Sequence, residues 1–164
     1  MTRVLEMNDY ESLLSTLAAA CIDEDQVRPG DVERFERVVT ALSETRDVRC
    51  IRPLLLRLDD ASPFTGTMEH ILLSLELLPA RQVFEELFLN LEDYMCRSPE
   101  WVRNIIISSL NTPSQHAAFS DAATTTTAAT KRELRDLLME MQVEHQQAIY
   151  DALIARMSVY EFTK

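Results

Sequence analysis

The 164-residue sequence predicts an all-α protein of about eight or nine helices, stacked as helical hairpins in an α-solenoid. Apolar residues recur three and four positions apart along most of the chain, which is the spacing of a buried helix face. The chain has only two glycines, whereas hairpin-rich β folds need many more for their tight turns. Predicted helix starts at Asp31, Thr65 or Thr67, Ser98 and Thr130 recur every 31 to 36 residues, a period typical of stacked hairpins. An ordinary helical bundle is the alternative that this spacing leaves open.

Three helices are predicted in the first third of the chain. The first covers Asn8–Ile22. The second is capped by Asp31 and runs to about Leu42, and the third covers Asp47–Leu58. In the third helix, Val48 belongs to the apolar stripe that we expect to face inward. Because Pro53 lacks an amide hydrogen, this helix is expected to kink there or to begin its regular part near Arg52.

Further helices are predicted over about 67–78, 80–97, 98–110, 114–123, 131–141 and 143–159. The clearest start is Ser98-Pro99-Glu100, where serine caps, proline takes the first helical position and an acid favours the helix amino end. Thr130 is expected to cap the 131–141 helix, with Glu133 completing a capping box. The run 124–127 consists of threonines and predicts a frayed helix end or a loop.

The length predicts one domain over residues 1–164, with a repeat-like core at about 31–160. Three widely spaced cysteines lie beside apolar residues and predict free, buried thiols in a reducing compartment. The first ten residues lack the apolar run of a secretion signal, and no segment has the roughly 20 apolar residues of a membrane span. We therefore expect a cytoplasmic protein.

The net charge of −11 is concentrated in the middle of the chain. Residues 59–100 contain nine acids and two arginines, a net charge of −7. Such a field repels phosphate backbones and anionic membranes, so neither nucleic acid nor a membrane is expected as a direct partner. It attracts a basic protein instead.

Eight carboxylates in this segment are the predicted partner-binding residues. They are Asp59, Asp60, Glu69, Glu76, Glu85, Glu86, Glu92 and Asp93. Adjacent helix residues point in different directions, so the paired acids are not presented as a dyad for acid–base chemistry. Two interpretations stay open: solvated helix faces and loop ends, or an electrostatic docking surface in the central repeats.

Catalytic and metal-binding patterns are missing from the sequence. The three histidines, His70, His116 and His145, lie on separate segments without local ligand partners. The sequence contains no Gly-x-Ser-x-Gly elbow and no phosphate-binding loop. We expect a protein that is not an enzyme and that uses no cofactor and no metal, with a helical hydrolase of dispersed ligands as the competing hypothesis.

Several segments carry a resemblance to a known family. The segment 47–60, with its Asp start, internal proline, aliphatic stripe and acidic end, resembles one helix of a HEAT-type repeat. The segments Met68–Leu75, Phe84–Leu87 and Ser98–Trp101, with the downstream 106–111, resemble the bacterial polymorphic-toxin immunity proteins catalogued as immunity protein thirty. The resemblance extends over about 32–153, and its most specific piece is the Ser-Pro-Glu-Trp helix start with the Leu-Asn end.

The resemblance implies a small, non-enzymatic, HEAT-like helical protein that belongs to a polymorphic-toxin or contact-dependent inhibition system. Such a protein binds a cognate toxin and covers its active site or blocks its substrate. The acidic middle of this chain fits a basic toxin, for example a nuclease. A helical-repeat adaptor or scaffold for another basic protein is the alternative function.

Overall fold

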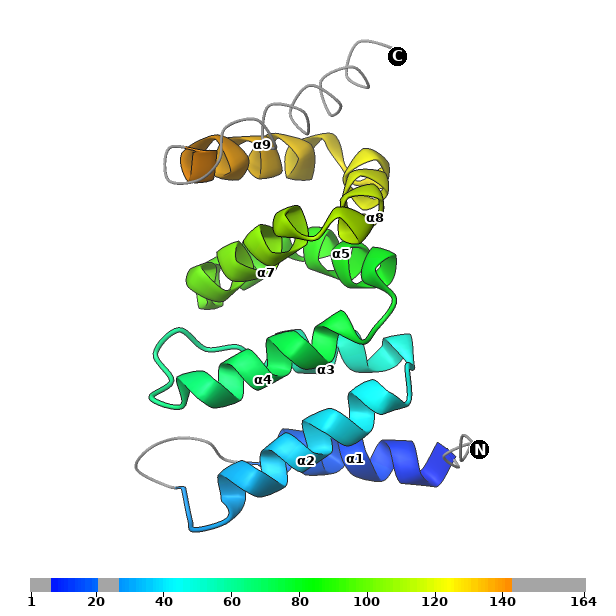
Figure 1. Ribbon diagram of the computed structural model, residues 1–164, viewed down its shortest axis with the longest axis vertical. Helices are drawn as coiled ribbons and strands as arrows, with labels where there is room; N and C mark the ends of the chain where they lie inside the picture. The colour runs from blue at the N-terminus through cyan, green and yellow to red at the C-terminus, as the bar shows by residue number, and fades with distance from the viewer. Residues whose placement is uncertain (1–6, 21–26, 143–164) are drawn as a thin grey trace. The chain divides into compact units, whose positions relative to one another are not determined.

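The computed structural model describes residues 7–20 and 27–142, and these residues form helices joined by turns, without a strand (Figure 1). The helices are α1 Met7–Ala19, α2 Asp31–Glu44, the 3-10 helix η1 Val48–Cys50, α3 Ile51–Leu55, α4 Thr65–Glu76, α5 Ala80–Leu89, α6 Leu91–Arg97, α7 Pro99–Asn111, α8 Pro113–Thr125 and α9 Ala128–Gln142. The predicted all-α class is confirmed. The predicted helix over 143–159 lies outside the described residues.

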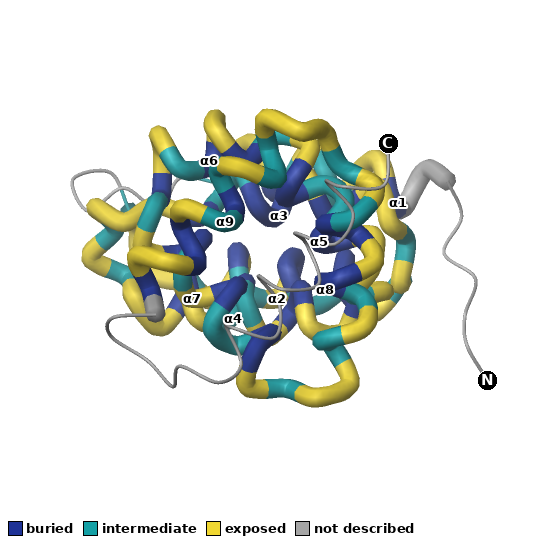
Figure 2. The backbone as a smooth tube through the Cα atoms, turned by 90° about the horizontal axis from the view of Figure 1, so that it is seen from above, coloured by how far each residue is buried: buried dark blue, intermediate teal, exposed yellow. Residues whose placement is uncertain are grey.

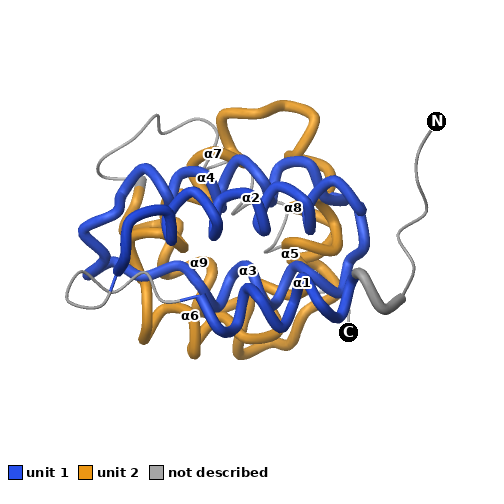
Figure 3. Tube along the Cα trace, turned by 90° about the horizontal axis from the view of Figure 1, so that it is seen from below, with its two compact units in different colours: residues 1–79 blue, residues 80–164 orange. Residues whose placement is uncertain are grey.

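The chain divides into two compact units, residues 1–79 and 80–164 (Figure 3). The described helices of unit 1 are α1 to α4, and those of unit 2 are α5 to α9. In both units the buried residues recur along one side of each helix (Figure 2). The single domain and the solenoid over the whole chain stay predictions.

Unit 1 contains two helical hairpins packed side by side. Helix α2 contacts α1 and also α4, and α3 contacts the same two helices. An apolar stripe with helical spacing is buried on α2 at Phe35, Val38, Val39 and Leu42. These contacts hold α2 and α4 as neighbours within one unit, so both helices contribute to the same local surface.

The start of α2 differs from the prediction. Asp31 is the first helical residue, and Gly30 precedes it with a φ of 87°, a left-handed conformation that glycine adopts without strain. The Asp31 side chain accepts a hydrogen bond from the backbone N–H of Arg28 at 2.9 Å. Asp31 therefore stabilises the preceding turn, and its expected role as the cap of the helix was wrong.

The segment around Pro53 begins with a short 3-10 turn and becomes α-helical at Ile51, close to the predicted Arg52. Pro53 is the third residue of α3, where a backbone N–H would have no acceptor within the helix, so its missing hydrogen costs little. Asp47 caps η1 by accepting a hydrogen bond from the Arg49 N–H at 2.9 Å. Val48 was expected to face inward, but 46% of it is exposed because it begins this turn.

Unit 2 is organised around the contact between α5 and α8. The ring of Phe119 on α8 meets those of Phe84 and Phe88 on α5 edge-on, at centroid distances of 5.3 and 5.1 Å. Edge-to-face packing of this kind is a favourable arrangement of aromatic rings. Helix α7 packs against α6 and α8, and α9 adds the buried residues Leu134, Leu137, Leu138 and Met141 to the core of the unit.

The predicted helix over 80–97 is two helices, because the backbone breaks at Asn90 (φ −126°, ψ 30°). The Asn90 side chain donates hydrogen bonds to the Glu86 carbonyl at 3.2 Å and to Glu86 Oε1 at 2.9 Å. An asparagine that bonds to nearby backbone competes with helix continuation. The single long helix was therefore a wrong prediction.

Two predicted caps are also corrected. Pro99 occupies the first turn of α7 as expected, but the Ser98 side chain makes no capping hydrogen bond. The predicted capping box at Thr130 and Glu133 is wrong, because Thr130 lies inside α9 and its N–H donates to the Thr127 hydroxyl at 3.2 Å. The starts of α2, α4 and α7 nevertheless recur 34 residues apart, whereas α9 begins 29 residues after α7, so the expected period holds for the first three starts, without the expected caps.

Candidate partner-binding surface

The eight predicted carboxylates are divided between the two units. Unit 1 holds Asp59, Asp60, Glu69 and Glu76, all exposed. Unit 2 holds Glu85 and Glu86, which are half-buried, and Glu92 and Asp93, which are exposed. The structure thus brings Glu69 and Glu76 together on α4, and Glu92 and Asp93 on α6. One continuous acidic face made by all eight stays a prediction.

Several of these carboxylates have structural partners, among them Asp59, Glu85 and Glu86. Asp59 Oδ1 accepts a hydrogen bond from the Ala61 N–H at 2.9 Å in the loop before α4. Glu85 forms an exposed ion pair with Arg81 at 2.7 Å. Glu86 Oε1 accepts from Asn90, as described above, and from the Tyr94 hydroxyl at 3.2 Å. Glu86 therefore ties α5 to α6, which is a structural role that the charge pattern could not distinguish from docking.

In unit 2, the charge of one carboxylate acts on a second carboxylate from a different helix. Burial raises the pKa of Glu133 on α9, and the nearby charge of Glu92 on α6 raises it further. A cationic group from a partner would relieve such repulsion between like charges. This interaction involves only the two carboxylates Glu92 and Glu133. The surface that combines several carboxylates with exposed apolar side chains lies in unit 1.

Helix α4 and its C-cap present two exposed leucines, Leu73 and Leu77, beside the acids of the helix. Leu73 is 61% exposed and Leu77 is 55% exposed, while Met68, Ile71 and Leu75 are buried on the opposite side. Neither leucine was predicted to be exposed, because apolar residues of the core and of the surface look alike in an apolar segment. The signal that could have found them is their position, which falls off the buried three-and-four stripe.

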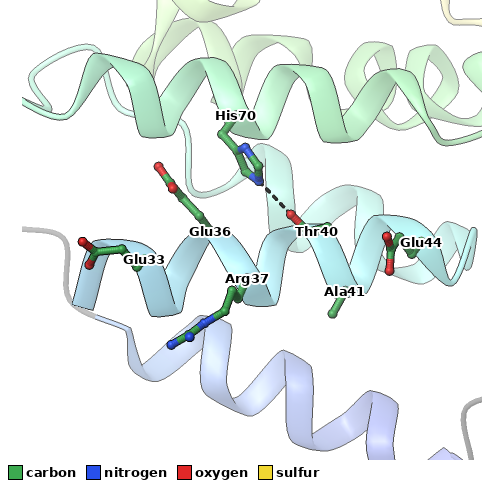
Figure 4. A pocket seen from close by; sticks show the side chains of 7 residues that line it. All are labelled: Glu33, Glu36, Arg37, Thr40, Ala41, Glu44 and His70. Atoms are coloured by element: carbon green, nitrogen blue, oxygen red, sulfur yellow. Dashed lines mark hydrogen bonds between the residues drawn. The ribbon is translucent and has the colours of Figure 1, made fainter. Parts of the chain in front are cut away.

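A hollow of about 400 Å³ adjoins α4 along the exposed side of α2 (Figure 4). Its lining residues are Glu33, Glu36, Arg37, Thr40, Ala41, Glu44 and His70. The His70 ring reaches from α4 to α2, where its Nε2 lies 2.9 Å from the Thr40 hydroxyl. The Thr67 hydroxyl of α4 donates a hydrogen bond to Glu36 Oε1 at 3.1 Å. Two side-chain contacts therefore join the helices that form this region.

We call the outer side of these two helices the α2–α4 surface, with the residues Glu33, Glu36, Glu44, Glu69, His70, Leu73, Glu76 and Leu77. Residues three, four or seven positions apart share a helix side, so His70, Leu73 and Leu77 form one stripe. Glu69 and Glu76 lie on the other side of Leu73 from His70. The carboxylates of α2 were not predicted, because they precede the acidic segment counted in the sequence.

This arrangement offers binding groups for a macromolecule: apolar side chains in the middle and carboxylates at both edges. Among the described residues, no group of three or more histidine, cysteine, aspartate or glutamate side chains could hold a metal ion. None of the described helices is long and apolar enough to cross a membrane.

Comparison with known proteins gives a family match. The family model described as Immunity protein 30 matches residues 23–119, which include α2 to α7 and part of α8. The matched range contains every residue of the α2–α4 surface and all eight predicted carboxylates. No curated protein and no solved structure matches the chain.

Proposed function

We propose that this chain, which belongs to the Immunity protein 30 family, binds a cognate toxin domain. It neutralises the toxin by covering the toxin's active site or substrate-binding surface. The observation that carries the proposal is the family match, which covers more than half of the chain. In this mode of action the protein makes and breaks no covalent bond. It is a stoichiometric inhibitor and not an enzyme.

The charge of the chain supports a basic partner. The net charge of −11 favours the approach of a positively charged toxin, and exposed carboxylates then select among orientations. Nucleases, which bind phosphate backbones, are the class of toxin that this charge suits best.

The setting we propose is a bacterial polymorphic-toxin system, such as contact-dependent inhibition, with the immunity protein in the cytoplasm. A toxin delivered by a sibling cell would meet its inhibitor there before it reaches its substrate. The interface would need enough area and complementarity to outcompete that substrate.

Co-expression tests the proposal. Cells that express the toxin encoded in the neighbouring reading frame are expected to grow when this protein is abundant and to die when it is absent. A toxin from an unrelated system serves as the control and should remain lethal in both cases. Death in the presence of abundant, folded protein would contradict the proposal and favour the adaptor alternative.

A further inference from the structure

Leu73 and Leu77 are unusual among the apolar side chains of the described residues. Five large ones are strongly exposed: Val48, Leu73, Leu77, Leu89 and Met139. Only Leu73 and Leu77 lie one helical turn apart, Leu73 in the last turn of α4 and Leu77 at its C-cap, where the backbone keeps an α-helical conformation, so they form a continuous apolar strip. Exposed apolar groups that cluster in this way mark interaction sites more often than scattered ones do.

The strip is not needed to hold α4 in place. The opposite side of the helix buries Met68, Ile71 and Leu75, each at most 4% exposed. The hydrogen bonds from Thr67 to Glu36 and between His70 and Thr40 add to the attachment to α2. Since the packing of α4 is complete without its outer leucines, these side chains are available to a partner.

Carboxylates border the strip on both sides. Glu69 and Glu76 follow one edge along α4 itself. At the other edge, His70 leads to the hollow on α2, where Glu33, Glu36 and Glu44 lie. The single cation of the hollow, Arg37, points away from His70 (Figure 4).

An apolar centre with acidic edges fits one class of partner segment well. Lysine and arginine lay their aliphatic stems over apolar surface and hold their charged ends outside it, where carboxylates can meet them. Apolar side chains from the same segment would cover the leucines, and the centre of an interface usually contributes most of its affinity. The carboxylates would repel an anionic partner, and a purely apolar partner would offer them no opposite charge.

We propose that the α2–α4 surface is the toxin-docking surface, and that it receives a cationic, amphipathic segment of the toxin with apolar side chains on Leu73 and Leu77. Lysine and arginine side chains of the segment face Glu69 and Glu76 on one side and the acids of α2 on the other. The inference rests on the proposed function and specifies where and how the toxin is held.

The test measures binding to the toxin domain of the neighbouring reading frame, purified in a catalytically inactive form. The double variant Leu73→Asp/Leu77→Asp is expected to weaken binding by about 100-fold or more, because each leucine is placed at the centre of the interface. Leu89→Asp is the matched control, since Leu89 is a 73% exposed helical leucine outside this surface. Its affinity should equal that of the wild type.

A second variant addresses the acidic border. Glu69→Lys/Glu76→Lys is expected to slow association about tenfold at low salt and to reduce the salt dependence of the association rate, with little change in dissociation. Circular dichroism of every variant checks that the helices persist. If the double leucine variant fails to fold, a photo-crosslinking residue at position 73 should capture the toxin, while one at position 89 should not.

The outcomes separate the two proposals. If the wild type binds and protects, and both α2–α4 variants do so equally well, the docking surface is wrong and the proposed function stands. If the wild type neither binds the toxin nor protects against it, the proposed function fails and the docking surface fails with it. A loss of binding in Leu89→Asp but not in the α2–α4 variants would move the interface to unit 2.

Discussion

At the scale of single residues, burial changes the acid–base behaviour of Tyr10 and Cys50. Tyr10 is 3% exposed and Cys50 is fully buried, and burial is the main cause that raises the pKa of each to about 12. The guanidinium of Arg49 lies 4.4 Å from the centre of the Tyr10 ring and moderates the rise. The expected burial of the thiols is thus confirmed for Cys50 and wrong for Cys96, which is exposed, while Cys21 lies outside the described residues.

The raised pKa values predict a loss of stability in alkali. A group with a raised pKa in the folded state stabilises the fold fully below its ordinary pKa, which is 9.0 for Cys50 and 10.0 for Tyr10. This contribution disappears as the pH approaches about 12. The free energy of unfolding, measured by urea titration between pH 8 and 11.5, should therefore fall above about pH 9. Tyr10→Phe should reduce the fall above pH 10, and curves that decline in parallel for wild type and variant would contradict the assignment.

At the scale of elements, the break between α5 and α6 shows what apolar spacing can and cannot predict. The buried residues Val83, Leu87, Leu91 and Tyr94 keep helical spacing through the break, so the pattern predicts one helix. The interruption comes from the Asn90 side chain and its bonds to Glu86, which are local and leave no trace in the apolar period. The predicted caps were also wrong because of local geometry: capping depends on the backbone conformation as well as on the residue type, and the residue pattern does not reveal that conformation.

Glu86 and Glu85 are expected to respond differently to replacement by alanine. Glu86→Ala removes the acceptor of the Asn90 and Tyr94 hydrogen bonds and should lower the free energy of unfolding by about 1–3 kcal/mol. Glu85→Ala removes an exposed ion pair with Arg81 and should cost no more than about 0.5 kcal/mol. Urea unfolding of the two adjacent variants provides the comparison, and equal costs would argue against a structural role for Glu86.

At the scale of the whole molecule, the sequence predicted the helical class and the position of the buried faces, because burial imposes a period that residue types reveal. Residues such as Phe35, Leu42 and Phe84 fall on that period, and they are buried. The surface was harder to predict. Charge is visible in a sequence, whereas the exposure of Leu73 depends on which neighbours reach it and therefore on the fold.

The prediction of a single domain can be tested by the unfolding of variants in which one buried residue of either unit is replaced. Leu42 in unit 1 and Phe119 in unit 2 are fully buried, so their replacement by alanine should cost about 2–5 and 3–5 kcal/mol. Trp101, the only tryptophan, lies buried in unit 2 and reports by fluorescence. In a single cooperative domain, Leu42→Ala shifts the Trp101 transition as much as the transition in circular dichroism. A Trp101 transition that stays in place would mean that the units unfold independently.

The two-sided construction of α4 has a consequence for how partner choice can change over generations. Its inner side, with Met68, Ile71 and Leu75, maintains the fold, and its outer side is proposed to hold the toxin. Substitutions at Glu69, Leu73 or Leu77 would alter recognition with little penalty in folding, since these side chains lie outside the core. A lineage could therefore acquire resistance to a new rival by mutation along one helical stripe, while the remaining architecture is inherited unchanged.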